Sequence, residues 1–338
     1  MITNKTVVVV AAGASHDVKM PLGPGLQENI ANMLRPDVGV YRHLEGAAAN
    51  RFKDKDRLHA ISIVERASSL TKQLLSAASI DNFLDQHKDE RELVDFFKIT
   101  IAYALADAEK RSALSNDYST NESSIIGRTA DYFLHDFMNI VMRGHQADNV
   151  ADSMANLTFV IFNYDRCVER YLDLWMRFRF GPDFAWQPNA PKMIHVYGSL
   201  GDYFDSSTFN PFTYNGKYAF QNPHLELPQY ADKIKVFTEQ EDSVVQQEIL
   251  NSIHTAQALI FLGFGFEEQN MRFFEGKWDS KRVFATTLGM SDPNQVFIKE
   301  KLTNQFSDSA RSVFTLKGKS RALLSDLYHP LTSAVGSI

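Results

Sequence analysis

The chain has very little cysteine and no long apolar run. Among its 338 residues there is one cysteine, Cys167, which can form neither a disulfide within the chain nor a four-cysteine zinc module. No segment approaches the roughly 20 consecutive apolar residues that span a membrane, and no secretory leader precedes the first apolar segment. We therefore expect a cytoplasmic protein without membrane contact and without structural zinc.

An excess of positive charge is also lacking. The formal net charge is −6, whereas a dedicated nucleic-acid binder usually carries a basic excess, so direct nucleic-acid binding is not expected. The ten histidines show no paired spacing typical of metal ligands. With 44% hydrophobic and 22% charged residues, the chain can build a large folded core.

What the chain does contain is a series of short apolar segments typical of buried strands. Residues 7–10 are four consecutive valines, which predict a strand buried on both faces at the centre of a parallel sheet. Because helical segments separate the strands, the pattern predicts an α/β fold with a Rossmann-like, doubly wound, mostly parallel sheet. The further strands are expected at 157–162, 193–197, 258–262, 283–288 and 312–316.

The segment between the first two strands has helical periodicity almost throughout. The first helix is expected to begin near Pro24, and Ser79 is the expected N-cap of a later one. Because this connection is too long for a simple strand–helix crossover, we expect a helical insertion subdomain at 37–149 and one catalytic domain formed by 1–36 and 150–338. The periodicity predicts helices at 26–33, 57–78, 91–113 and 125–143, with a polar loop at 116–124.

Small or polar residues directly follow four of the predicted strands. In an open parallel sheet, ligands bind beyond the carboxyl ends of the strands, so these residues are expected to meet in one site. Small residues let a backbone turn pass close to a ligand. The four clusters lie at 11–15, 163–165, 195–199 and 263–266.

In this order, the four clusters resemble the motifs of the sirtuin superfamily. Sirtuins open with a strand and a Gly-Ala-Gly-x-Ser turn, which 11–15 match with Ala11 in place of the first glycine. Residues 163–165 (Asn-Tyr-Asp) are similar to the sirtuin Asn-x-Asp motif, and 195–199 (His-Val-Tyr-Gly-Ser) to the catalytic histidine before a glycine. The turn at 263–266 resembles the late glycine-rich turn that holds the adenosine end of NAD.

The resemblance is closer to the sirtuin-like NAD hydrolases of bacterial antiphage defence than to protein deacylases. One cysteine excludes the deacylase zinc module, the usual Asp-Phe-Arg is absent after Pro21, and the helical insertion with its Ser-Ile-Asp-x-Phe-Leu run at Ser79 looks like the defence branch. The resemblance implies an NAD glycohydrolase that releases nicotinamide and ADP-ribose and so depletes NAD during infection. It also implies a homo-oligomer and, as in some members, a separate HerA-type ATPase partner.

The resemblance further implies roles for individual residues. Asp165 would bind the nicotinamide carboxamide, Asn163 would bind the ribose and the attacking water, and His195 would accept a proton from the ribose hydroxyls or the water. NAD enters this scheme as the substrate. Its other contacts would come from Gly13, Ala14 and Ser15 at the diphosphate, and from Ala12, Pro21, Gly198, Ser199, Gly263 and Phe264.

Structural roles remain open for the same residues. Asn163 and Asp165 could cap the helix expected near Cys167. His195 could be a core histidine bonded to the backbone, and His16 a solvent-facing loop residue. These alternatives predict loss of stability rather than loss of chemistry when the residues are replaced.

Other features also allow two interpretations. Glu267 and Glu268 could bind ribose hydroxyls or favour a helix N-terminus. The apolar faces at 93–105 and 133–141 could serve self-association or be buried within the chain. The aromatic-rich segment 201–228 could cover the site or bury its own rings. The whole protein could also be an NAD-dependent protein deacylase, or a non-catalytic module that senses NAD or ADP-ribose.

Overall fold

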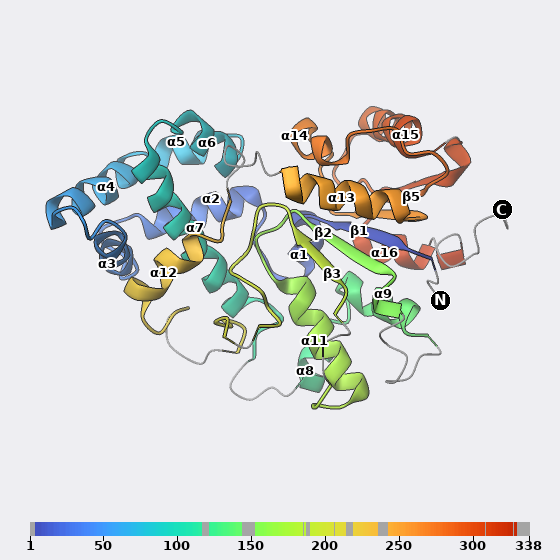
Figure 1. Ribbon diagram of the computed structural model, residues 1–338, viewed down its shortest axis with the longest axis horizontal. Coiled ribbons are helices and arrows are strands. Elements are labelled where there is room, and N and C mark those ends of the chain that lie inside the picture. The colour runs from blue at the N-terminus through green and yellow to red at the C-terminus, as the bar shows by residue number, and fades with distance from the viewer. Residues whose placement is uncertain are drawn as a thin grey trace.

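One parallel sheet organises the molecule. The computed structural model describes residues 4–116, 122–143, 153–184, 186, 190–205, 207–213, 219–235, 243–307, 309–326 and 328–329. Within them, the strands follow the order β3-β2-β1-β4-β5-β6, and every neighbouring pair is parallel (Figure 1). This order is that of Rossmann-like folds, so the predicted α/β class and parallel sheet are confirmed. The strands are β1 (Thr6–Val10), β2 (Leu157–Ile161), β3 (Lys192–His195), β4 (Ala258–Leu262), β5 (Arg282–Thr286) and β6 (Val313–Leu316).

The valines of β1 lie at the centre of the sheet and pack on both faces, as predicted. Val7 and Val9 belong to the apolar core on one side, and Val8 and Val10 to the core on the other. Helices α13 (Ser243–Thr255) and α15 (Asp292–Phe306) cover the first side, and α9 (Phe133–Val141), α11 (Cys167–Phe180) and α16 (Ser320–Asp326) cover the second (Figure 1). The result is three layers, helix–sheet–helix.

A lobe of helices adjoins one end of this sheet (Figure 1). Its apolar core unites helices from the connection between β1 and β2 with α12 (Pro223–Ala231), which comes much later in the chain. The domain boundaries at residues 36 and 149 stay a prediction. The packing crosses both boundaries, because α2 (Gly23–Met33) packs in the lobe, whereas α8 (Glu122–Arg128) and α9 pack toward the sheet. The other lobe helices are α2 (Gly23–Met33), α3 (Tyr41–Arg51), α4 (Arg57–Ser69), α5 (Thr71–Ser76), α6 (Ile80–Gln86) and α7 (Arg91–Arg111).

Several predicted helices are divided or displaced. The helix expected at 57–78 breaks at Leu70, which leaves α4 and α5 as separate helices. The helix expected at 125–143 breaks because Tyr132 is extended (φ −70°, ψ 134°). The helix expected to begin near Pro24 is confirmed as α2, which begins at Gly23 with proline in its first turn, but the short α1 (Ala12–Ser15) and the 3₁₀ turn η1 (His16–Val18) before it were not predicted. Helix α3 was not predicted, and the expected loop at 116–124 is helical from Glu122 onward.

The apolar faces left open by the sequence are buried within the chain. Phe96, Phe97 and Ile101 of α7 and Phe133 and Phe137 of α9 have no exposed surface, so these faces are not available for self-association. In the aromatic-rich segment, the rings at 209 and 220 stack on each other and join the lobe core. Residues 214–218 of that segment lie outside the described part of the chain.

Candidate functional site

The sheet reverses its winding direction between β1 and β4, and a cleft opens there. The chain runs from β1 outward through β2 to β3, then returns to place β4 on the free side of β1. Ligands of such sheets bind at this topological switch point, beyond the carboxyl ends of the strands. The cleft has a volume of about 760 Å³, within the range of small-molecule sites. We call it the switch-point cleft, and its lining includes Ala12, Pro21, Asp81, Asn163, Asp165, Tyr197, Gly263, Glu267, Asn270 and Arg272.

The turns after β1 and β4 touch through two glycines at the base of this cleft. Gly263 has a φ of +61°, and a Cβ there would lie 2.1 Å from the backbone nitrogen of Ala14. A Cβ on Gly13 would lie 2.9 Å from the Cα of Gly263. The N–H of Gly13 donates to the carbonyl of Gly263 (3.3 Å), and the N–H of Gly263 donates to Thr286 Oγ1 (2.8 Å). Both glycines are therefore required by the contact between the turns.

A directional chain of hydrogen bonds joins the ends of β1 and β2. Asn163 Nδ2 donates to Ser15 Oγ (2.9 Å), and Ser15 Oγ donates to Asp165 Oδ1 (3.2 Å). The same carboxylate oxygen accepts the backbone N–H of Cys167 (3.1 Å), the first residue of α11. The three side chains that form this series of hydrogen bonds are all buried. Asp165 therefore bonds to the first residue of α11, although Arg166 holds the N-cap position, whereas Asn163 bonds to Ser15 and not to the helix.

The environment of Asp165 brings the pKa of its carboxyl group close to neutrality. Burial raises the pKa of this carboxyl to about 6, the hydrogen bonds from Cys167 act in the opposite direction, and the charges of Glu109 and Glu169 raise it further. A carboxyl group with a pKa so close to neutrality, on the wall of a cleft, is typical of functional sites.

His195 lies at the end of β3 but lines a different hollow. This second cavity, of about 640 Å³, is lined by His195, Gly198, Ser199 and Lys233 together with Glu169, Asp202 and Tyr203. The imidazole is held between two acceptors, the carbonyl oxygen of Asn163 (Nδ1, 3.2 Å) and Glu169 Oε1 (Nε2, 2.5 Å). His195 is thus bonded to the backbone, as the structural alternative predicted, and this bond connects it to Asn163 in the lining of the switch-point cleft.

The remaining predicted contacts divide between the two hollows and the core. Ala12, Pro21 and Gly263 line the switch-point cleft, whereas Gly198 and Ser199 line the second cavity. Phe264 is buried in an aromatic cluster with Phe162 and Phe261. The donors predicted for a diphosphate are already used, because Gly13 N–H bonds to Gly263, Ala14 N–H bonds to the carbonyl of residue 11 (2.8 Å) and Ser15 bonds to Asp165.

Sequence reasoning missed several residues that shape the site. Tyr197 lines the cleft, and its hydroxyl donates to Asn270 Oδ1 (2.6 Å). Arg272 is the one basic side chain among the described residues of the cleft lining. Glu169 carries the carboxylate that holds His195. Its place in the first turn of the helix that follows Asp165 was the available signal.

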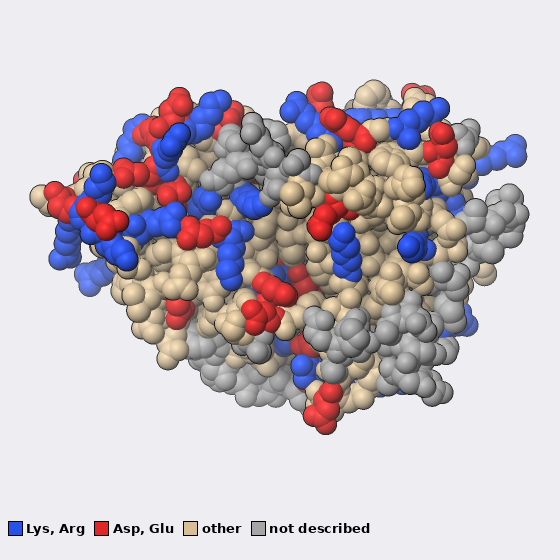
Figure 2. Space-filling model, viewed as in Figure 1, with Lys and Arg blue, Asp and Glu red and all other residues tan. Residues whose placement is uncertain are grey.

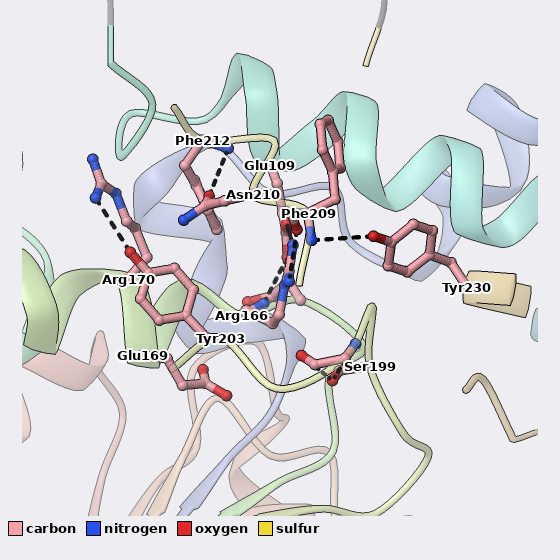
Figure 3. A network of polar contacts seen from close by, with 12 residues as sticks. Glu109, Arg166, Glu169, Arg170, Ser199, Tyr203, Phe209, Asn210, Phe212 and Tyr230 are labelled. Carbon is pink, nitrogen blue, oxygen red and sulfur yellow. Dashed lines mark hydrogen bonds and ion pairs between the residues drawn. The ribbon is translucent and has the colours of Figure 1, made fainter. Parts of the chain in front are cut away.

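Below the site, a buried ion pair fastens α11 to α7. The carboxylate of Glu109 accepts three hydrogen bonds from Arg166: from the backbone N–H (2.9 Å), from Nε (3.2 Å) and from Nη2 (2.7 Å). Arg166 Nη1 also donates to the carbonyl of Phe209 (3.2 Å). Figure 3 shows this pair at the centre of a network that reaches Arg170 and Tyr203. Because Arg166 follows Asp165 directly, the pair fixes the backbone on which Asp165 sits.

The outer surface gives no single charged patch on the face shown in Figure 2, where basic and acidic side chains are interspersed over α3, α4 and α5. Within the described ranges, no group of three or more His, Cys, Asp or Glu side chains is placed to hold a metal ion. In the same part of the chain, no helix is long and apolar enough to cross a membrane.

No protein-family model matches the chain, and no curated protein matches it in sequence.

Proposed function

We propose that the protein is a sirtuin-like NAD glycohydrolase that binds NAD in the switch-point cleft and splits it into nicotinamide and ADP-ribose. One observation carries the proposal: Asn163 and Asp165 line a dinucleotide-sized cleft at the switch point and are joined there through Ser15. Asn163 and Asp165, which form one of the four motifs behind the resemblance, thus lie where a Rossmann-like sheet binds its ligand.

The acidic side chains of the cleft suit cleavage of the bond between nicotinamide and ribose. The nicotinamide ring of NAD is cationic and leaves as a neutral molecule, so its departure needs no general acid. The C1′–N bond breaks with its electron pair going to the ring, and the sugar passes through a cationic, oxocarbenium-like state. Asp165 and Asp81 line the cleft, and carboxylates near this developing charge stabilise it. Water then bonds to C1′ and releases its proton.

The hydrogen-bond chain fixes which atom of Asn163 faces the substrate. Ser15 Oγ uses its hydrogen toward Asp165, so it can only accept from Asn163, and the amide nitrogen of Asn163 fills that role. Asn163 Oδ1 is left as an acceptor for a ribose hydroxyl or for the attacking water. This assignment supports the role that the resemblance implies for Asn163.

Arg272 is our candidate for contact with the diphosphate. The backbone donors of Gly13 and Ala14 are engaged by carbonyl groups, so a diphosphate needs another source of positive charge. The Arg272 side chain lines the cleft and makes no hydrogen bond or ion pair with the described residues. Its planar guanidinium suits a phosphate oxygen pair.

A second function is a non-catalytic sensor of NAD or ADP-ribose. It is favoured by the placement of His195, whose two ring nitrogens are both occupied and which lies outside the switch-point cleft. A deacylase, the third reading of the sequence, would require an acyl-lysine substrate for turnover. The role in antiphage defence, the homo-oligomer and the HerA-type ATPase partner also belong to our proposal, since they rest on the resemblance alone.

The test is incubation of the purified protein with NAD, alone and with a HerA-type ATPase, followed by separation of nicotinamide from intact NAD. We expect release of nicotinamide and ADP-ribose in equal amounts and without any acylated peptide. Turnover that occurs only with an acylated peptide would establish the deacylase. NAD binding without turnover in every condition would establish the sensor.

A further inference from the structure

The two ring nitrogens of His195 face the backbone carbonyl of Asn163 and the side chain of Glu169, and both of these groups accept hydrogen bonds when Glu169 is ionised. Nδ1 lies 3.2 Å from the carbonyl oxygen of Asn163, and Nε2 lies 2.5 Å from Glu169 Oε1. A neutral imidazole has a single N–H and would direct a lone pair at one of these oxygens. With Glu169 ionised, only the doubly protonated ring satisfies both contacts.

We propose that Glu169 is a positioning residue that holds His195 as an imidazolium, and that the Nδ1–H of this cation anchors the backbone carbonyl of Asn163. Glu169 lies in the first turn of α11, and its side chain is 5% exposed. His195 is the last residue of β3 and its side chain is 13% exposed. The pair therefore ties β3, the turn after β2 and α11 together behind the cleft wall.

The surroundings concentrate the charge of Glu169 on this one contact. Its second oxygen, Oε2, is buried and has no hydrogen-bond partner among the described residues, so none of their other donors shares the charge of the carboxylate. The other ionisable groups nearby are Asp165, behind the Asn163 turn, and Asp202, Lys233 and Tyr203 around the second cavity. Burial opposes the imidazolium, but the charge and hydrogen bond of Glu169 and the Asn163 carbonyl outweigh it and raise the pKa of His195.

This inference changes the part that His195 plays in the proposed reaction, and in that respect it rests on the proposed function. An imidazolium cannot take a proton from water or from a ribose hydroxyl. His195 would instead act through Asn163, by fixing the backbone that carries the amide toward the cleft. The role predicted from the resemblance, that of a proton acceptor, would then require the Glu169 contact to break.

The test is an NMR titration of the His195 ring nitrogens in the full-length protein without NAD. We expect both nitrogens to carry protons at pH 7 and the wild-type ring to titrate above its ordinary pKa of about 6.5. In Glu169→Gln the titration should move down by about one pH unit or more, and Glu169→Asp should recover part of the difference. Glu92→Gln is the matched control, because Glu92 contacts His59 in the same way (3.0 Å) on the surface.

The wild-type spectrum decides the question even if Glu169→Gln does not fold. A single protonated nitrogen on His195 at pH 7 would overturn the proposal, and so would an unchanged titration in a folded Glu169→Gln protein. Because no NAD is present, this result is independent of the proposed hydrolysis. If turnover is found, it should fall as the pH rises through the pKa of His195. A rise in the turnover rate over the same pH interval would instead support His195 as the general base.

Discussion

Replacing Asn163 with alanine is expected to lower the rate of NAD hydrolysis by about 10²–10⁴-fold, the range for loss of a group that positions a reacting water. The substitution removes the acceptor that we assign to the ribose or the water, and it leaves Ser15 without its donor. The valine core of β1 is untouched, because Asn163 lies beyond the end of β2. The measurement is nicotinamide release under saturating NAD, in whichever condition activates the wild type.

The matched control is Asn251→Ala, which removes an exposed asparagine from α13 on another part of the surface. It should hydrolyse NAD at the wild-type rate. Thermal unfolding of both variants separates chemistry from stability. If Asn163→Ala melts at a clearly lower temperature but keeps the wild-type rate per folded molecule, Asn163 has a structural role and our assignment of the site is wrong.

Replacing Glu109 with alanine is expected to cause the largest loss of stability, about 3–5 kcal/mol in the free energy of unfolding. Glu109 and Arg166 are 0% and 1% exposed, and removal of the carboxylate leaves a buried guanidinium without its partner. It also leaves the backbone N–H of Arg166 without an acceptor. Urea unfolding followed by circular dichroism gives the change, and NAD hydrolysis should weaken as well, because Asp165 precedes Arg166 directly.

Glu90→Ala is the control for this prediction, since it removes a surface carboxylate, 42% exposed, that pairs with Arg66 and His87. Exposed pairs contribute about 1 kcal/mol or less. The double variant Glu109→Leu, Arg166→Met should be more stable than Glu109→Ala, because it removes both buried charges together. Equal stability of Glu109→Ala and Glu90→Ala would contradict the account.

The sequence allowed the sheet to be predicted because its signals are local. Four consecutive valines identify a doubly buried strand, and β1 is central in the structure. The small and polar residues after the strands could be placed at one edge because parallel strands end there together. This reasoning correctly brought Asn163, Asp165 and Gly263 to one cleft.

The other features of the site could not be predicted, because they depend on distances that exist only in the folded chain. Asn163 and His195 follow neighbouring strands, yet they open onto different hollows because the His195 ring turns toward Glu169 on α11. Gly13 was expected to approach a ligand, but it approaches Gly263, and only the register of β1 against β4 could show that contact. Arg272 reaches the cleft from the η4 turn (Arg272–Phe274), which carries no motif.

The most direct test of the central claim is a crystal structure of Asn163→Ala soaked with NAD, in which slow turnover keeps the dinucleotide intact. We predict that NAD lies across the switch-point cleft, with its diphosphate near Arg272 and its nicotinamide ribose beside Asp165 and the position vacated by Asn163. NAD bound in the second cavity beside His195, or a cleft that stays empty at saturating NAD, would contradict the account.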